Sequence, residues 1–289
     1  GNTIIELKYY DENNKPFLLP EKGYAKIRQT YNNRGLLIRE TYHNEENGEE
    51  VSARRTDYMV AGIDYEYADD GNLICEVYKD ASDQPVNRYD TGYAMRFQEF
   101  KNGKHVKTHY QGYMDKVLQD VPNKKYGIGS VEYVYANGHE VEERYFDING
   151  NPVLRSDIGC AVLKMEYNNR GLEAAYFYYG TDGEPILRKD TGYAVLRYQY
   201  DELGRKVLLH YFGVDQKPVI STEDHCAGRQ YQYDEEGNRS DTRYLDVNDN
   251  LMTRRDLGYA RINRKYNEDG KVVEERYFDS DGQPVACKE

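Results

Sequence analysis

The chain has 289 residues, of which 38% are hydrophobic and 31% charged, with 51 acidic against 39 basic side chains and a net charge of -12. Such a composition lies at the boundary between folded and disordered chains, but 31 tyrosines supply large apolar area and favour strands. The acidic balance excludes a nucleic-acid partner, which requires clustered Lys and Arg, and no apolar run approaches the length of a membrane span.

A tyrosine recurs along the chain at a period of about 33 residues. Its nine copies lie at positions 9, 42, 78, 110, 145, 178, 211, 244 and 277. A second series is aromatic at all of its copies, at positions 31, 67, 100, 135, 167, 200, 233 and 266. Periods of roughly 20 to 50 residues are typical of repeat architectures. The sequence therefore predicts about eight repeats that form one repeat domain over residues 1–289.

Each repeat opens on a small tripeptide and a strand. Gly-Tyr-Ala stands at 23–25, 92–94, 192–194 and 258–260, and weaker versions such as Gly159-Cys160-Ala161 and His225-Cys226-Ala227 replace it elsewhere. Over 194–200, Ala194, Leu196, Tyr198 and Tyr200 alternate with Val195, Arg197 and Gln199. Alternation with period two predicts a strand with the first set buried and the second set facing water.

A hairpin and a short return complete the repeat. Asp201 to Arg205 forms a turn with a glycine in the left-handed position, and a second strand runs roughly from Lys206 to Phe212. A second turn then leads to Pro218-Val219, which we expect to be a third, short extended segment. One hairpin cannot bury its own face, so stacked neighbours must do so.

These elements predict an all-β fold, an elongated array of stacked hairpins or a β-solenoid. The alternative is a closed ring, like a propeller or a barrel, although propeller blades usually need about 40–45 residues. Gly1 is followed directly by strand-like sequence, and the chain begins and ends within repeats. We therefore expect a fragment of a longer protein, one that lacks any signal peptide of the original.

Two repeats break the pattern. Residues 43–59 carry three extra residues, and residues 111–127 replace the second turn and its proline. Insertions in a repeat array map to loops on one face, sometimes the binding face, and the other interpretation is neutral drift. Residues 110–123 are the one stretch in which a helical period is conceivable, and they remain unassigned.

Motifs for catalysis or cofactor binding are missing from the sequence, which predicts a protein that is not an enzyme and has no cofactor or metal. His105 and His109 would be about 13 Å apart on a strand, too far for one ion. The acidic turns only echo a calcium loop, and turn chemistry explains them without an ion. The cysteines at 75, 160, 226 and 287 lack metal-ligand spacing and are expected to be small buried residues.

The remaining candidates for a binding site are the tyrosines of the Gly-Tyr-Ala tripeptides, Tyr24, Tyr93, Tyr193 and Tyr259. Apolar replacement by Cys, Val or Ile in other repeats favours burial. Their place at the start of a strand leaves room for exposure, and an exposed row of rings could stack on sugars or pack against a peptide.

Two short motifs resemble bacterial families. Tyr198-Gln199-Tyr200-Asp201-Glu202-Leu203-Gly204-Arg205 resembles the tyrosine–aspartate (YD) repeats of Rhs-type surface and toxin proteins. Tyr145-Phe146-Asp147-Ile148-Asn149-Gly150 is more weakly similar to choline- or glucan-binding cell-wall repeats, which are shorter and use Trp, a residue that this chain lacks. Both resemblances imply β-hairpin arrays in exported bacterial proteins.

We therefore expect a non-catalytic interaction module at a bacterial surface or in secreted form, which binds a cell-wall or other glycan, or a protein. The alternative is a structural spacer or shell segment of a larger exported protein, with no ligand of its own. The extracellular or cell-surface location rests on the resemblance.

Overall fold

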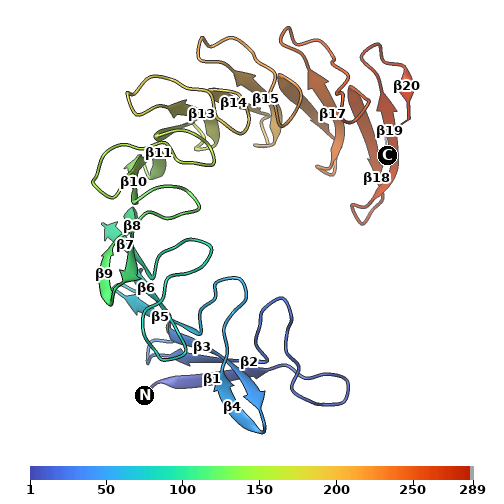
Figure 1. Cartoon of the computed structure of the whole chain (residues 1–289). Helices are drawn as coiled ribbons and strands as arrows, with labels where there is room; N and C mark the ends of the chain where they lie inside the picture. The colour runs from blue at the N-terminus through green and yellow to red at the C-terminus, as the bar shows by residue number, and fades with distance from the viewer. Residues whose placement is uncertain (287–289) are drawn as a thin grey trace. The chain divides into compact units, whose positions relative to one another are not determined.

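The computed structural model describes residues 1–286 and contains twenty β-strands and no helix in that range. The predicted all-β array of stacked hairpins is confirmed, and its hairpins are built from antiparallel strands (Figure 1). The described part of the chain contains no helix that could span a bilayer. Cys287, one of the cysteines expected to be buried, lies outside the described residues.

Every complete repeat contributes one hairpin. The first strands are β2 (Lys26–Tyr31), β5 (Gly62–Tyr67), β7 (Met95–Lys101), β10 (Ser130–Ala136), β12 (Val162–Tyr167), β14 (Val195–Tyr200), β16 (Gly228–Tyr233) and β18 (Arg261–Tyr266). The second strands are β3 (Leu37–Glu46), β6 (Leu73–Lys79), β8 (Lys104–Met114), β11 (His139–Phe146), β13 (Glu173–Tyr179), β15 (Lys206–Phe212), β17 (Arg239–Leu245) and β19 (Val272–Phe278). Four further strands are β1 (Thr3–Lys8), β4 (Glu49–Ser52), β9 (Val117–Asp120) and β20 (Pro284–Val285).

Contacts divide the chain into two compact units. The first comprises Gly1–Tyr133 and Arg144–Ser156, and the second comprises Val134–Glu143 and the residues from Asp157 on. In the first unit the strands pair in the order β1, β2, β3, β5, β6, β7, β8 and β10, with β4 and β9 added to β3 and β8. In the second unit they pair in chain order from β12 to β20. That residues 1–289 form a single domain stays a prediction.

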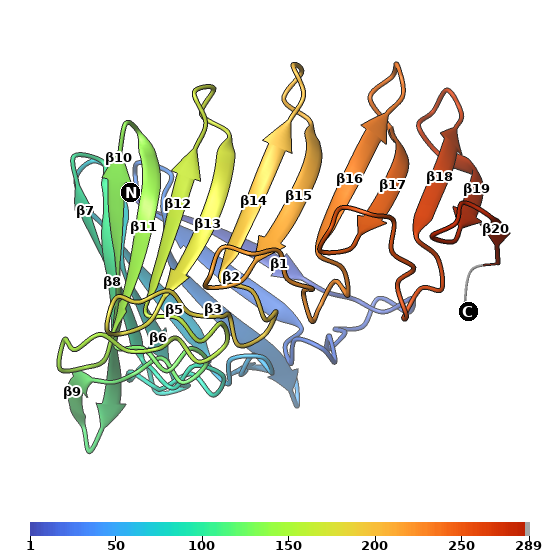
Figure 2. The same cartoon turned by 90° about the horizontal axis from the view of Figure 1, so that it is seen from above.

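Neighbouring hairpins pair with one another over a much shorter length than the two strands within a hairpin. β14 pairs with β15 from Val195 to Tyr200, whereas β13 pairs with β14 only through Ala175, Tyr176 and Phe177. The hairpins consequently diverge toward their turns, as Figure 2 shows for β14–β15, β16–β17 and β18–β19. The array is thus joined along the ends of the strands that adjoin the long loops.

Turn chemistry fixes the register of each hairpin. In the turn after β14, Gly204 has a φ of 82°, a conformation that glycine adopts without strain, and Asp201 accepts the backbone N–H of Arg205 at 2.9 Å. The register shifts between Gln199 and Tyr200, which marks a bulge just before the turn. The turn predicted at this position is confirmed.

The alternation predicted for the first strands is largely confirmed. Arg197 and Gln199 are exposed, and Ala194 is buried. Val195, predicted to face water, is buried instead, with 1% of its surface exposed. Its Cα partner is Phe212, and both faces of the sheet are covered where the strands meet the loops. Residues 110–123, left unassigned by the sequence, belong mainly to β8 and β9 and contain no helix.

The short return after each hairpin is confirmed as an extended segment. It forms isolated bridges such as Tyr179 to Pro185 and Phe212 to Pro218, and at the end of the array it becomes β20. Beyond it, successive loops bond to one another through their backbones. Thr222 donates to the carbonyl of Thr191 at 2.9 Å, and Lys189 donates to that of Ile158 at 3.0 Å.

The tripeptide that opens a repeat has a separate task for each residue. Gly192 has a φ of 73°, and a Cβ there would lie 3.0 Å from Cγ2 of Thr222 in the next loop. Ala194 is 1% exposed and donates its N–H to the carbonyl of Phe212, so only a small side chain fits. Tyr193 lies between them and belongs to the core described below.

Candidate functional site

The four tyrosines considered as binding residues are buried. Tyr24, Tyr93, Tyr193 and Tyr259 expose 4%, 5%, 5% and 6% of their surface. Each lies between the recurrent tyrosines of two successive hairpins. Burial raises the pKa of the Tyr24 and Tyr93 phenols above the ordinary value, because the phenolate would lose its hydration. The burial suggested by their apolar replacements is confirmed.

These rings form trios with the recurrent tyrosines on either side. Tyr193 lies 4.7 Å from Tyr211 in a stacked arrangement and 5.9 Å from Tyr178 edge to face, as measured between ring centroids. The same trio recurs as Tyr9–Tyr24–Tyr42, Tyr78–Tyr93–Tyr110 and Tyr244–Tyr259–Tyr277. Because neighbouring rings cover both sides, a sugar or peptide could stack on the central ring only if the trio opened. A binding role for these four tyrosines stays a prediction.

An arginine that the sequence reasoning missed completes the core of most repeats. Arg188 donates from Nη1 to the hydroxyl of Tyr178 at 3.1 Å, and from Nε and Nη2 to the two carboxylate oxygens of Asp190 at 2.9 and 2.5 Å. Burial alone would lower the pKa of this guanidinium, but the bonds to Asp190 raise it above the ordinary value. Two fixed acceptors therefore hold the cation in place between the loop and the tyrosines.

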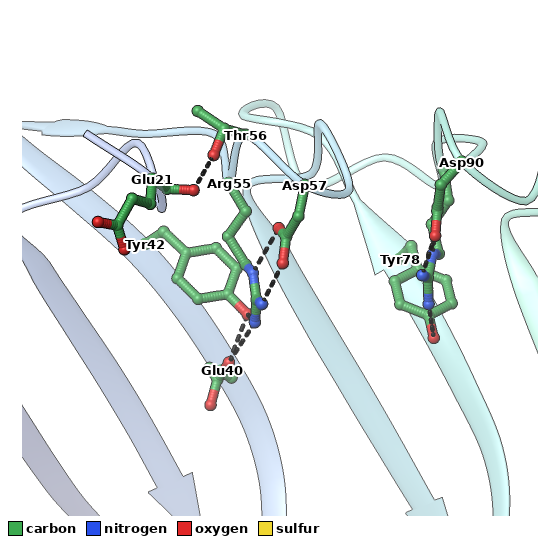
Figure 3. Close-up of polar contacts among 9 residues, drawn as sticks. Glu21, Glu40, Tyr42, Arg55, Thr56, Asp57, Tyr78 and Asp90 are labelled. Atoms are coloured by element: carbon green, nitrogen blue, oxygen red, sulfur yellow. Dashed lines mark hydrogen bonds and ion pairs between the residues drawn. The ribbon is translucent and has the colours of Figure 1, made fainter. Parts of the chain in front are cut away.

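This set of an arginine with the recurrent tyrosine and an aspartate, here called the arginine node, recurs in both units. In the first unit, Figure 3 shows Arg55 bonded to Tyr42 and Asp57, and the hydroxyl of Tyr42 also donates to Glu40. The other copies are Arg88 with Tyr78 and Asp90, Arg155 with Tyr145, and Arg254 with Asp256 and the ring of Tyr244. In most copies the arginine follows the recurrent tyrosine by ten residues, a signal that a longer alignment of the repeats could have found.

Three repeats lack this arginine. Leu19, Asn123 and Ser221 take its place. At Ser221 the role passes to Asp224, which accepts a hydrogen bond from the hydroxyl of Tyr211 and forms an ion pair with Arg229. At this node a carboxylate therefore replaces the guanidinium, and the hydroxyl of Tyr211 still has a hydrogen-bond partner.

Four tyrosines of the second aromatic series hold the diverging ends of the hairpins together. The hydroxyl of Tyr200 donates to the carbonyl of Glu173 at 2.8 Å, and that of Tyr233 donates to the carbonyl of Lys206 at 2.7 Å. Tyr67 and Tyr266 make the same bond to Leu37 and Arg239. Each bond bridges the second strand of one hairpin and the first strand of the next.

The acidic turns that echo calcium loops use their carboxylates on their own backbone. Oδ1 of Asp246 accepts the N–H groups of Asn248 and Asn250 at 2.8 and 2.9 Å. Asp147 makes the same two bonds to Asn149 and Asn151. These N–H donors lower the pKa of Asp246 because they stabilise the carboxylate. Within residues 1–286, no group of three or more His, Cys, Asp or Glu could hold a metal ion.

Two extended hairpins occupy the irregular repeats of the first unit. β3 continues into β4 through the turn Asn47-Gly48, and β8 continues into β9 through Asp115-Lys116. Glu50 of β4 forms ion pairs with Lys26 and Arg28 of β2, which tie the extension to the first strand of its own hairpin. Figure 2 shows the hairpin of β8 and β9 standing out beyond the neighbouring loops.

The tips of these hairpins differ in character. The tip at β4 is acidic, with Glu45, Glu46 and Glu49 exposed. The tip at β9 is apolar: Met114, Val117 and Leu118 are 47%, 61% and 38% exposed. It turns through two non-glycine residues of positive φ, Asp115 at 50° and Lys116 at 63°, where Asn-Gly would be the relaxed choice. Strain combined with exposed apolar area distinguishes this tip from the regular turns.

The cysteines have no sign of reactivity. Cys75 and Cys226 are buried, and burial raises the pKa of each thiol to about 12. A thiol that stays protonated at neutral pH is a poor nucleophile. The predicted burial of Cys75, Cys160 and Cys226 is confirmed.

Comparison with known proteins gives only distant structural likeness. No protein-family model matches the chain, and no curated protein matches it. The structure of TcdB2-TccC3-TEV is 12% identical with a TM-score of 0.32, over 87% of this chain. A Photorhabdus luminescens Tc holotoxin pore is 12% identical with a TM-score of 0.27, over 90% of this chain. The chain spans 17% of the length of each of those chains.

Proposed function

We propose that this chain is a non-catalytic structural segment of a larger exported protein. One observation carries the proposal: the residues that recur in each repeat are used to join that repeat to its neighbours. Tyr193 fills the space between two hairpins, Arg188 links a loop to the core, and Tyr200 bridges diverging strands. Recurrent residues with these tasks are what a scaffold requires. The export is supported by the resemblance to YD repeats.

Removal of one repeat tests the scaffold directly. In a stacked array, stability is approximately a sum of repeat terms and nearest-neighbour terms, so one period can be removed without loss of the fold. We expect a variant that lacks residues 195–227, with Ala194 joined to Gly228, to keep β-type circular dichroism and a cooperative unfolding transition. Loss of the fold in this variant would show that the repeats are not interchangeable units.

A second candidate function is the binding of a protein through the hairpin of β8 and β9. It is favoured by the exposed apolar side chains of Met114, Val117 and Leu118 at a strained turn. All four residues of β9 are exposed, and β8 is its one strand partner in the described chain. An exposed strand edge of this kind can accept an extended peptide as an additional strand.

A displayed library of random peptides tests this second function. Selection against the whole chain should enrich extended apolar peptides that bind in solution. Their binding should be lost when residues 111–122 are replaced by the sequence of residues 212–220, the shorter return of a regular repeat. Peptides that bind this variant equally well would contradict a role for the hairpin. Binding of a glycan is the other expectation from the sequence, and a glycan array with the same two proteins tests it.

A further inference from the structure

Junctions between neighbouring hairpins are closed in two ways. The first is the hydroxyl bond of the second aromatic series, as from Tyr233 to the carbonyl of Lys206. The second is a cationic or imidazole side chain that reaches from one hairpin to the next. Arg205 lies 4.6 Å from the ring centroid of Tyr233, and the ring of His139 lies 4.4 Å from that of Tyr167.

Near its turns, the junction of β6 and β7 has neither closure, although Arg96 of β7 donates to Glu76 of β6 at 2.9 Å nearer the long loops. Phe100 stands where the other copies of the series have tyrosine, so no hydroxyl reaches the carbonyl of Leu73, the counterpart of Lys206. The turn of the preceding hairpin contains Asp69, Asp70 and Asn72, with no Arg, Lys or His that could cross the junction. Asn72 instead donates to Asp70 within its own turn.

A groove of about 560 Å³ lies at this junction. Its apolar walls come from Ile74, Phe97 and Phe100, which are half-buried. Phe100 also packs against His105 of its own hairpin, with 5.3 Å between the ring centroids.

The charges that line the groove are negative. Glu66, Asp70 and Glu99 line it, and neither Glu66 nor Glu99 forms an ion pair with Lys or Arg among residues 1–286. Lys107, the cross-strand partner of Glu99, forms an ion pair with Glu132 at 3.3 Å instead. His109 is the basic residue of the lining, and its Nδ1 lies 3.6 Å from Glu99.

We propose that this groove binds an arginine side chain from a partner protein. A guanidinium is attracted to the face of an aromatic ring, here Phe100, and it donates to carboxylates at the same time. Glu66 and Glu99 supply the carboxylates, and the carbonyl of Leu73 supplies the acceptor that other junctions offer to a tyrosine hydroxyl. The partner's arginine thus takes the place that Arg205 and the hydroxyl of Tyr233 occupy in a regular junction.

The probe for this site is a hexa-arginine peptide, with hexa-citrulline as its neutral counterpart. Titration calorimetry at moderate salt should show binding of the first and none of the second. Phe100→Tyr is the decisive variant, because it restores the hydroxyl bond without a change in net charge. We expect it to weaken binding about tenfold, whereas the matched variant Tyr233→Phe in a regular junction leaves the affinity unchanged. Equal affinity of wild type and Phe100→Tyr would overturn the proposal.

The carboxylates are tested in the same way. Glu99→Gln should weaken binding of hexa-arginine about fivefold. The charge-matched control Glu235→Gln, at an exposed turn of another hairpin, should have the much smaller effect expected from net charge alone. Equal losses in the two variants would mean that the peptide responds only to the overall charge of -12. In that case the groove would not be its site.

Discussion

The hairpins from β12 to β19 and those from β2 to β9 are built from the same repeat, but they keep it to different degrees. In the first set the recurrent tyrosines follow one another at intervals of 33 residues, and each return begins at the same turn position. In the second set two hairpins are extended, and Phe100 stands in the place of one tyrosine of the second series. The regular set shows what the fold requires of a repeat.

Departures from the pattern therefore identify the residues that are free to serve another purpose. The extended hairpins and the groove at Phe100 all lie in the first unit. The regular residues can be altered only at the expense of stability, whereas we expect the irregular ones to change binding with little effect on stability. The variants below test this difference.

Removal of a ring from a tyrosine trio should have the largest effect. Tyr193→Ala deletes a ring that packs between Tyr178 and Tyr211, and large-to-small substitutions of this kind cost about 3–5 kcal/mol. Chemical denaturation of wild type and variant measures the loss. Leu118→Ala at the tip of β9 is the control from the irregular set, with an expected change below about 1 kcal/mol. A loss below about 1 kcal/mol for Tyr193→Ala would contradict its place in the core.

Loss of the arginine node should have the next largest effect. Arg188→Ala leaves the carboxylate of Asp190 and the hydroxyl of Tyr178 without their partner, and we expect a loss of about 3 kcal/mol in the free energy of unfolding. Lys217→Ala is the control, because its side chain is 80% exposed. That variant should remain within about 0.5 kcal/mol of wild type. Similar losses for the two would show that the node is not a structural element.

A single hydroxyl distinguishes the regular junction from the one at Phe100. Tyr233→Phe removes the bond to the carbonyl of Lys206 and should reduce stability by about 1 kcal/mol. Phe100→Tyr should increase stability by a similar or smaller amount, because the carbonyl of Leu73 lies at the position of the acceptor in a regular junction. The midpoints of thermal unfolding for the two single variants measure both changes. Opposite signs are required, and a decrease in both would mean that the junction cannot accept the hydroxyl.

Replacement of a turn carboxylate should have the smallest effect on stability, and this effect should appear only at acidic pH. Backbone donors lower the pKa of Asp246 in the folded protein, so its contribution is present above the ordinary pKa of Asp and is lost as the pH falls toward the folded value. Asp246→Asn keeps an oxygen acceptor that does not titrate, as Asn168 shows in another turn. The variant should match wild type at neutral pH and lose less stability below pH ~4. Parallel curves of stability against pH would contradict this account.

Much of the fold could be predicted because the sequence pattern recurs in every repeat. The period locates each hairpin, and alternation assigns the faces of residues such as Arg197 and Gln199. Val195 was assigned to the wrong face because alternation in one strand cannot show that two consecutive residues, Ala194 and Val195, are both buried where the strand begins. Residues 110–123 were not assigned because the extended hairpin replaces the proline turn that marks the other repeats.

The candidate site was harder to predict than the fold. The sequence shows that the tyrosines recur with a regular period. Whether Tyr193 is exposed, however, depends on Tyr178 and Tyr211, which approach it from different repeats. The node at Arg188 is visible as a fixed spacing once the loops are aligned. By contrast, the groove at Phe100 depends on the absence of a hydroxyl at one copy, which has meaning only when the bond made by the other copies is known.

The state of the tyrosine hydroxyls tests the central claim most directly. With 31 tyrosines and no tryptophan, an absorbance titration reports tyrosinate alone. Burial raises the pKa of Tyr24, Tyr78 and Tyr93 above the ordinary value of about 10, and raises that of Tyr198 to about 12. Between the two values the folded protein holds more protons than the unfolded chain, so its stability falls as the pH rises through the ordinary pKa.

We predict that the circular dichroism is unchanged while the first tyrosinate absorbance appears. The buried tyrosines should ionise only together with the alkaline unfolding transition. If all of the tyrosines ionised near their ordinary pKa in the folded protein, the tyrosine trios would not be its core, and the account of the array given above would be wrong.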